Sequence, residues 1–201
     1  MKKLTLSFIF VIIFALSSFA QTTEHLKFKG VPIDGTLSEY IAKMNQAGFQ
    51  LVETDDGEAL LEGEFAGYKD CIIGVKTLQK QNLVHEIVVL FPSQDKWSGL
   101  YYDYERLKTM LTKKYGAPTK CVERFVNTPS YRDISDDNDK MEELEDDHCE
   151  YYSMYELNSG NIVLSIKSDN VLLGFRVNRI KLFYSDKVNS EKFEDAAMED
   201  L

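Results

Sequence analysis

The stretch from residue 34 to residue 49, DGTLSEYIAKMNQAGF, decides the fold because it starts a helix and gives that helix one apolar side. Thr36 and Glu39 have the spacing of a capping box, in which each side chain accepts a hydrogen bond from the other residue's backbone N–H. Apolar residues then recur at intervals of three and four, at Leu37, Tyr40, Ile41, Met44 and Ala47. Gly48 favours a helix end. The stretch therefore predicts a helix over residues 36–47 that lays one side on a sheet.

Short runs rich in β-branched and aromatic residues follow this helix, and turn residues separate them. The runs are FQLVET, EALLEGEFAG, CIIGVKTL and LVHEIVVLF. Runs of this length and composition with short connections predict an antiparallel meander. One more strand, LKFKGVPI, is expected before the helix.

A second segment repeats this order. Ser98 is a candidate N-cap, and Gly116 with Pro118 ends the helix. Its apolar stripe consists of Leu100, Tyr101, Tyr104, Leu107, Leu111 and Tyr115. The strands that follow are expected in KCVERFV, CEYYSMYEL, NIVLSIKS and RIKLFYS, with a hairpin at 158–160 between the middle two.

These patterns predict an α+β protein built from two tandem units, each a helix followed by an antiparallel β-meander. The first unit spans 21–92 and the second spans 93–186, with the junction near Pro92-Ser93. We expect the two meanders to form one sheet with both helices on the same face. The other face would then be open to a partner.

This order of elements resembles the fold of the β-lactamase inhibitor protein, and it is similar to helix-and-meander domains of periplasmic lipoproteins that assemble outer-membrane proteins. The run 28–49, FKGVPIDGTLSEYIAKMNQAGF, is also similar to a run in exported proteins of gut-dwelling Gram-negative bacteria. The resemblance covers most of residues 26–186 and implies protein binding through a concave sheet. The odd number of cysteines departs from a fully bridged inhibitor.

The first 20 residues have the three parts of a secretory signal peptide. Lys2 and Lys3 precede an uncharged run from Leu4 to Phe19, and Ser18 and Ala20 are the small residues before a cleavage site. The alternative is a membrane anchor, but this run is shorter than the ~20 residues that a bilayer span needs. We therefore expect cleavage before Gln21, no membrane span afterwards, and a periplasmic or secreted product.

The charge of the mature chain is negative and local. Removal of Lys2 and Lys3 changes the formal net charge from −10 to −12, which disfavours nucleic acid as a partner. Ten of the acidic residues lie between Asp133 and Glu150, in a predicted acidic loop at 132–148, and an acidic C-terminal tail is expected at 187–201. The loop fails the EF-hand pattern because Asn138 and Leu144 occupy its glycine and glutamate positions. It is interpreted as a solvated loop or a short acidic helix, with only weak cation binding as an alternative.

Three cysteines remain in the mature chain, so one intrachain disulfide at most is expected in an oxidising compartment. Cys121 and Cys149 are the favoured pair because they flank the acidic loop. Cys71 lies in a run that predicts a buried strand, where a free thiol is common.

The run CEYYSMYEL carries the candidate binding residues. Strand alternation puts Glu150, Tyr152, Met154 and Glu156 on one side, and the two glutamates indicate that this side faces water. Exposed tyrosine and methionine suit a protein interface, although a wet antiparallel face also tolerates them.

Catalytic and metal-binding patterns are not found in the sequence. The motifs G-x-S-x-G and H-E-x-x-H are missing, and so is a glycine loop that cradles phosphate. Cys149 beside His148 is the one local nucleophile candidate, but the surrounding acids oppose a thiolate. We therefore predict a non-catalytic exported module, without cofactor or metal, that binds an unknown protein of the envelope or the exterior. The alternative is a carrier or sensor of a small molecule or cation, with a pocket between helix and sheet.

Overall fold

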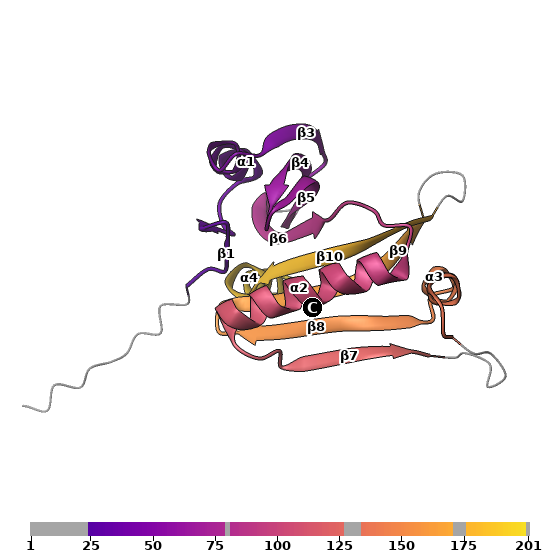
Figure 1. Cartoon of the computed structure of the whole chain (residues 1–201). Helices are drawn as coiled ribbons and strands as arrows, with labels where there is room; N and C mark the ends of the chain where they lie inside the picture. Colours follow the sequence, from indigo (N-terminus) through magenta and orange to yellow (C-terminus); the bar gives the residue numbers. More distant parts are fainter. Residues whose placement is uncertain (1–23, 79–80, 127–133, 171–175, 200–201) are drawn as a thin grey trace, which may run out of the picture.

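A computed structural model describes residues 24–78, 81–126, 134–170 and 176–199 of the chain. The predicted signal peptide, 1–20, lies outside these residues. Eight strands form one antiparallel sheet in the order β3-β4-β5-β6-β10-β9-β8-β7 (Figure 1). The helices are α1 (Leu37–Gln46), α2 (Trp97–Tyr115), α3 (Asp137–Glu145) and α4 (Lys187–Glu199). The strands are β1 (Lys27–Phe28), β2 (Val31–Pro32), β3 (Gln50–Asp55), β4 (Glu58–Phe65), β5 (Tyr68–Leu78), β6 (Leu83–Leu90), β7 (Lys120–Phe125), β8 (Cys149–Leu157), β9 (Gly160–Asn170) and β10 (Arg176–Asp186).

Helix α1 forms where the capping box predicts it. The Thr36 hydroxyl accepts a hydrogen bond from the Glu39 backbone N–H, and the Glu39 carboxylate accepts one from the Thr36 N–H at 3.0 Å. Tyr40 and Met44 are fully buried against the sheet. Gly48 has a φ of 96°, a left-handed conformation that suits glycine and turns the chain into β3.

The sheet joins strands from both halves of the chain. Strands β3–β6 follow α1 and strands β7–β10 follow α2, and the last strand of each run lies at the centre, where β6 pairs with β10. Val89 lies opposite Leu182 in this central pair. The α+β class with a mostly antiparallel sheet is therefore confirmed.

Helices α1 and α2 lie on the same face of this sheet, which we call the covered face. The α1 helix contacts β3–β6, and α2 lies over β9 and β10 and runs nearly along them (Figure 1). Register places Ile73, Val89, Leu182 and Leu164 on this face in neighbouring strands, and each is at most 1% exposed. The other side of the same strands is called the opposite face.

The N-terminal region and the start of α2 differ from the prediction. Residues 26–33 form a hairpin of two short strands rather than one strand, because Lys29 and Gly30 both have positive φ and turn the chain. Helix α2 begins at Trp97, and Ser98 does not cap it. The Ser98 hydroxyl instead donates to Asp137 at 2.6 Å and links α2 to α3.

Most of the segment expected as an acidic C-terminal tail forms helix α4. The buried Asp186 carboxylate accepts hydrogen bonds from the backbone N–H groups of Asn189, at 2.9 Å, and Leu26, at 2.7 Å. The Asn189 amide donates to the carbonyl oxygens of Ile33 and Val84. These contacts hold the start of α4 and the N-terminal hairpin together at the end of β10.

The start of α4 also borders one end of the opposite face. Ser185 alternates with the buried Tyr184 and Asp186, so its side chain belongs to the opposite face. Its hydroxyl lies 3.4 Å from that of Ser190 in α4. The start of α4 therefore lies over this end of the opposite face, and the helix contacts β6, β10 and β9.

Candidate functional site

One line of residues crosses the opposite face at right angles to the strands. It takes one residue from each of the eight strands, paired side by side through the register of the sheet. In sheet order this middle row is Glu53, Leu60, Gly74, Val88, Phe183, Val163, Met154 and Lys120. The row is apolar over six strands and ends in an acid on one side and a base on the other.

The apolar part of this row keeps contact with solvent. Leu60 is 40% exposed, and Val88, Phe183, Val163 and Met154 are each partly exposed. Residues one step away in the same strands, such as Val89 and Leu164, are fully buried. The opposite face is therefore apolar at its centre without the burial that the covered face receives from α1 and α2.

The four candidate binding residues predicted from the sequence all lie on β8 and on this face. Tyr152 and Met154 are partly exposed, whereas Glu156 is exposed. Glu150 is held by Arg124, whose guanidinium lies 2.7 Å from the carboxylate. The Lys120 ammonium lies 5.4 Å from the centre of the Tyr152 ring, within the range of a cation–π contact.

Tyr152 belongs to a second row that runs beside the middle row. In sheet order this Tyr152 row is Gln50, Glu62, Ile72, Leu90, Lys181, Ser165, Tyr152 and Val122. It lies on the side of the middle row away from Ser185 and α4. The two rows together make an apolar strip with polar residues among its members.

Charge divides the opposite face into two halves. On β7–β10 this face carries the bases Lys120, Arg124, Lys167, Arg179 and Lys181 and the acids Glu150, Glu156 and Asp169. On β3–β6 it carries the acids Glu53, Asp55, Glu58, Glu62 and Glu86 and the base Lys76. The first half is net basic and the second is net acidic.

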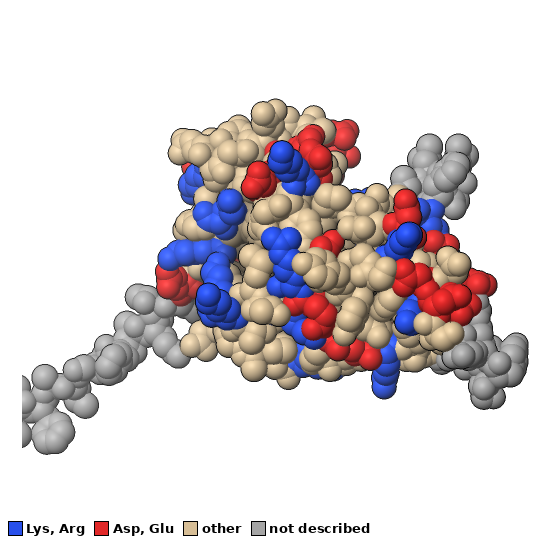
Figure 2. All heavy atoms as spheres, in the orientation of Figure 1, with Lys and Arg blue, Asp and Glu red and all other residues tan. Residues whose placement is uncertain are grey.

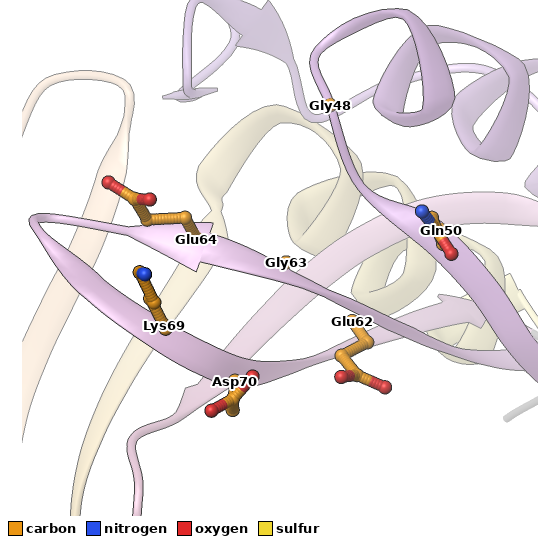
Figure 3. A pocket seen from close by; sticks show the side chains of 7 residues that line it. All are labelled: Gly48, Gln50, Glu62, Gly63, Glu64, Lys69 and Asp70. Carbon is orange, nitrogen blue, oxygen red and sulfur yellow. The ribbon is translucent and has the colours of Figure 1, made fainter.

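Two open hollows lie in the acidic half. The larger, of about 280 Å³, is lined by Gly48, Gln50, Glu62, Gly63, Glu64, Lys69 and Asp70 (Figure 3). Figure 3 shows that its charged side chains come from both strands of the β4–β5 hairpin. The smaller, of about 220 Å³, is lined by residues of β3 and β4. Strand residues dominate both hollows, so neither is the pocket between helix and sheet that a carrier would need.

The disulfide expected between Cys121 and Cys149 is not made in this structure. All three cysteines are free thiols. Cys121 pairs with Ser153 across β7 and β8, whereas Cys149 pairs with Phe125, so four strand positions separate them. At about 3.3 Å per residue this is about 13 Å, beyond the ~7 Å between Cα atoms that a disulfide permits. The spacing in the sequence did not reveal this register.

The surroundings of the thiols do not favour nucleophilic chemistry. The Cys121 sulfur lies 3.2 Å from a Glu123 carboxylate oxygen and 3.5 Å from the Ser153 hydroxyl. A neighbouring carboxylate opposes the negative charge of a thiolate. Burial raises the pKa of the Cys149 thiol to about 12, which keeps it protonated.

The acidic segment is a short helix rather than a loop over its described part. Asp136 caps α3 by accepting the Asp139 N–H at 2.9 Å, and Leu144 is buried. Figure 2 shows acidic side chains gathered around this end of the molecule. His148 lies 2.8 Å from a Glu143 carboxylate oxygen, but among the described residues no group of three or more His, Cys, Asp or Glu side chains is placed to hold a metal ion.

The sequence indicated the residues of β8 that share this face, but not the other residues of the two rows. Val88, Phe183 and Val163 stand in apolar runs where both neighbours are also apolar, as in IVVL and NIVL. Such runs indicate that both sides of a strand are apolar. That signal is present, but it does not tell which strands lie side by side.

Comparison of the chain with family models, with curated proteins and with solved structures found no match. Within the described part of the chain, no helix combines the length and the apolar character that crossing a membrane requires.

Proposed function

We propose that this protein is an exported, non-catalytic binding module that engages a protein through the opposite face of its sheet. The observation that carries the proposal is the middle row, which is apolar over six strands and only partly buried. Large exposed apolar patches with a polar rim mark interaction sites in proteins. The leader at 1–20 supports the exported location, in the periplasm or outside the cell.

Other features agree with this proposal. The acidic helix α3 and its neighbours would steer a basic partner toward the molecule. We also propose that the two helix-and-meander halves are repeats of one unit. The resemblance of this arrangement to the β-lactamase inhibitor protein likewise implies binding through a sheet.

The test is affinity capture from an extract of the cell envelope, with the mature chain as bait. A Tyr152→Ala, Met154→Ala variant removes two side chains of the opposite face. A matched control, Tyr102→Ala, Met110→Ala, removes the same residue types from the outer side of α2, where they are 68% and 44% exposed. We expect the captured proteins to be lost with the first variant and kept with the control.

Thermal unfolding of both variants shows whether they remain folded. Recovery of the same proteins by the wild type and by the Tyr152, Met154 variant would remove the opposite face as the binding surface.

A further inference from the structure

We propose that β3, at the edge of the sheet, binds an extended peptide segment of a partner protein, with basic side chains on one side of the segment and apolar side chains on the other. The segment would join the sheet as a further antiparallel strand. The inference goes beyond the proposed function and adds a second surface, because Tyr152 and Met154 lie in β8, near the other edge of the sheet.

Strand β3 is an edge strand and, among the described residues, pairs only with β4. All of its residues, Gln50–Asp55, are exposed. An edge strand directs the N–H and C=O groups of alternate residues away from the sheet, where an extended segment can pair with them. Backbone groups available for strand addition therefore lie along β3.

The β3 edge also exposes large apolar side chains. Leu51 and Val52 are 45% and 58% exposed, and Leu60 in the adjacent strand is 40% exposed. At the other edge of the sheet, Val122 and Phe125 of β7 are partly buried. The β3 edge is therefore the one at which an added strand would remove more apolar surface from water.

The two sides of β3 differ in character, and this difference sets the pattern of the added strand. Register places Leu51 beside the buried Leu61 on the covered face, whereas Glu53 and Asp55 lie on the opposite face. A strand paired with β3 alternates its side chains between the same two faces. Apolar side chains of the segment would lie next to Leu51, and the basic side chains between them would lie next to the two acids.

The two hollows beside β3 have the charge that basic side chains need. The acids that line the smaller hollow are Glu53, Asp55 and Glu58. The charged residues that line the larger hollow are three acids and one base, Glu62, Glu64, Asp70 and Lys69 (Figure 3). Among the described residues, Lys76 pairs with Glu58 at 3.2 Å, whereas Glu53 and Asp55 form no ion pair. An ammonium or guanidinium group in either hollow would therefore meet an excess of carboxylates.

The spacing of the hollows fits an extended segment. The smaller hollow lies beside residues 58–60 of β4, and the larger lies beside residues 62–64, four positions farther along the strand. At about 3.3 Å per residue this separation is about 13 Å. The first and fifth residues of an extended segment point to the same side at the same separation. Basic residues at these two positions would therefore reach both hollows.

Charge favours a segment of another protein over a second copy of this chain. Pairing of two β3 strands would bring their acidic edges together. The basic side chains of the other edge strand, β7, already have partners in the chain. Arg124 lies 2.7 Å from the Glu150 carboxylate, and the Lys120 ammonium lies 5.4 Å from the centre of the Tyr152 ring. Bases for the β3 edge therefore have to come from a different protein.

The test is fluorescence anisotropy of labelled peptides of about eight residues, long enough to span β3, titrated with the mature chain. A peptide in which lysine alternates with valine is expected to bind and saturate. Two control peptides should bind at least about tenfold more weakly. One has glutamate in place of lysine, and the other has the same composition with all its lysines consecutive.

N-methylation of the peptide tests the backbone pairing. Methyl groups on the lysine amides or on the valine amides give two peptides with the same side chains. Only one of these two sets of amides can face β3, so one methylated peptide should lose binding and the other should keep it. Equal affinity of the two methylated peptides would show that the segment does not join the sheet, and would overturn the proposal.

Charge reversal locates the bound peptide on the protein. The Glu53→Lys, Glu62→Lys variant changes one acid of each hollow and should raise the Kd at least about tenfold. The control variant, Asp95→Lys, Asp146→Lys, makes the same change in net charge at exposed positions outside β3–β5. It should change the Kd by no more than about twofold. Thermal unfolding of both variants shows whether they remain folded.

No binding of the lysine–valine peptide, or the same Kd for the two charge-reversal variants, would overturn the proposal. Sedimentation equilibrium of the chain alone tests the other occupant. A wild type that associates and becomes monomeric with Glu53→Lys, Glu62→Lys would identify a second copy at the β3 edge, and would also overturn it.

The proposed function fails separately. The Tyr152→Ala, Met154→Ala variant should bind the peptide like the wild type, and a loss of peptide binding in this variant would contradict the assignment to β3. If this variant loses the captured envelope proteins while the wild type does not bind the peptide, the opposite face remains the binding surface and only the β3 proposal fails. If the peptide binds at β3 but capture does not depend on Tyr152 and Met154, only the proposed function fails.

Discussion

The two faces of the sheet are made by the same strands, and adjacent residues differ in what covers them. Leu164 is buried beneath the helices, whereas Val163, the residue before it, is partly exposed on the opposite face. Val88 and Val89 differ in the same way. Both faces are apolar at the centre, so composition does not distinguish them. What differs is that α1 and α2 lie on the covered face, while the opposite face borders α4 at one end and has an apolar strip that is partly exposed.

The largest effect is expected from truncation on the covered face. Leu164→Ala leaves a cavity in the core and should lower the free energy of unfolding by about 2–5 kcal/mol. Val163→Ala, the matched change on the opposite face, should cost less than about 1 kcal/mol because its site is partly solvated. Urea unfolding of both variants measures the difference. Equal losses would show that both faces are covered alike.

A smaller effect is expected at the end of β10, where Asp186 and Ser185 point to different faces. Asp186→Ala leaves the N–H groups of Leu26 and Asn189 without their acceptor, and should lower the free energy of unfolding by about 2–3 kcal/mol. Ser185→Ala should change it by no more than about 0.5 kcal/mol. Faster hydrogen exchange at the Leu26 amide in the Asp186 variant would confirm that the loss of stability comes from the lost hydrogen bond. A Ser185 variant as unstable as the Asp186 variant would contradict it.

The cysteines show how far the covered face extends. Burial raises the pKa of the Cys71 thiol to about 11 and that of Cys149 to about 12, whereas Cys121 at the sheet edge is exposed. A thiol reagent added to the folded protein should therefore modify Cys121 rapidly and the other two only on unfolding. Rapid modification of Cys149 would mean that the covered face ends before β8.

The same burial predicts a loss of stability in alkali. In the unfolded chain a thiol ionises near its ordinary pKa of about 8.5. The folded chain holds these protons to higher pH. Ionisation of the thiols therefore stabilises the unfolded state relative to the folded state once the pH exceeds the pKa of the unfolded chain. The urea midpoint should hold steady below about pH 8.5 and fall as the pH rises towards 11 and 12, the pKa values of Cys71 and Cys149. Replacement of Cys149 by alanine should reduce the slope.

The elements that could be predicted from the sequence are those with strong local signals. The capping box of Thr36 and Glu39 and the stripe through Tyr40 and Met44 locate α1 to within a residue or two. Alternation in CEYYSMYEL separates the two sides of β8 correctly. These signals depend on neighbours in the chain.

Other features depend on contacts between distant residues and could not be predicted. The pairing of β6 with β10, and hence the middle row, is set by how side chains of both halves pack together. The failed disulfide has the same origin, because the register between β7 and β8 separates Cys121 from Cys149. Helix α4 is polar in sequence and is held by Asp186 and by contacts with β6, β9 and β10.

The central claim, that the opposite face is accessible until a partner covers it, can be tested most directly by methionine oxidation followed by mass spectrometry. Met154 lies in the middle row, Met44 is fully buried under α1, and Met110 is exposed on α2. In the isolated protein, Met154 should oxidise much faster than Met44, and it should become protected when a partner binds, while Met110 stays reactive throughout. If Met154 is as slow to oxidise as Met44 in the dilute protein, the face is already covered and the account is wrong.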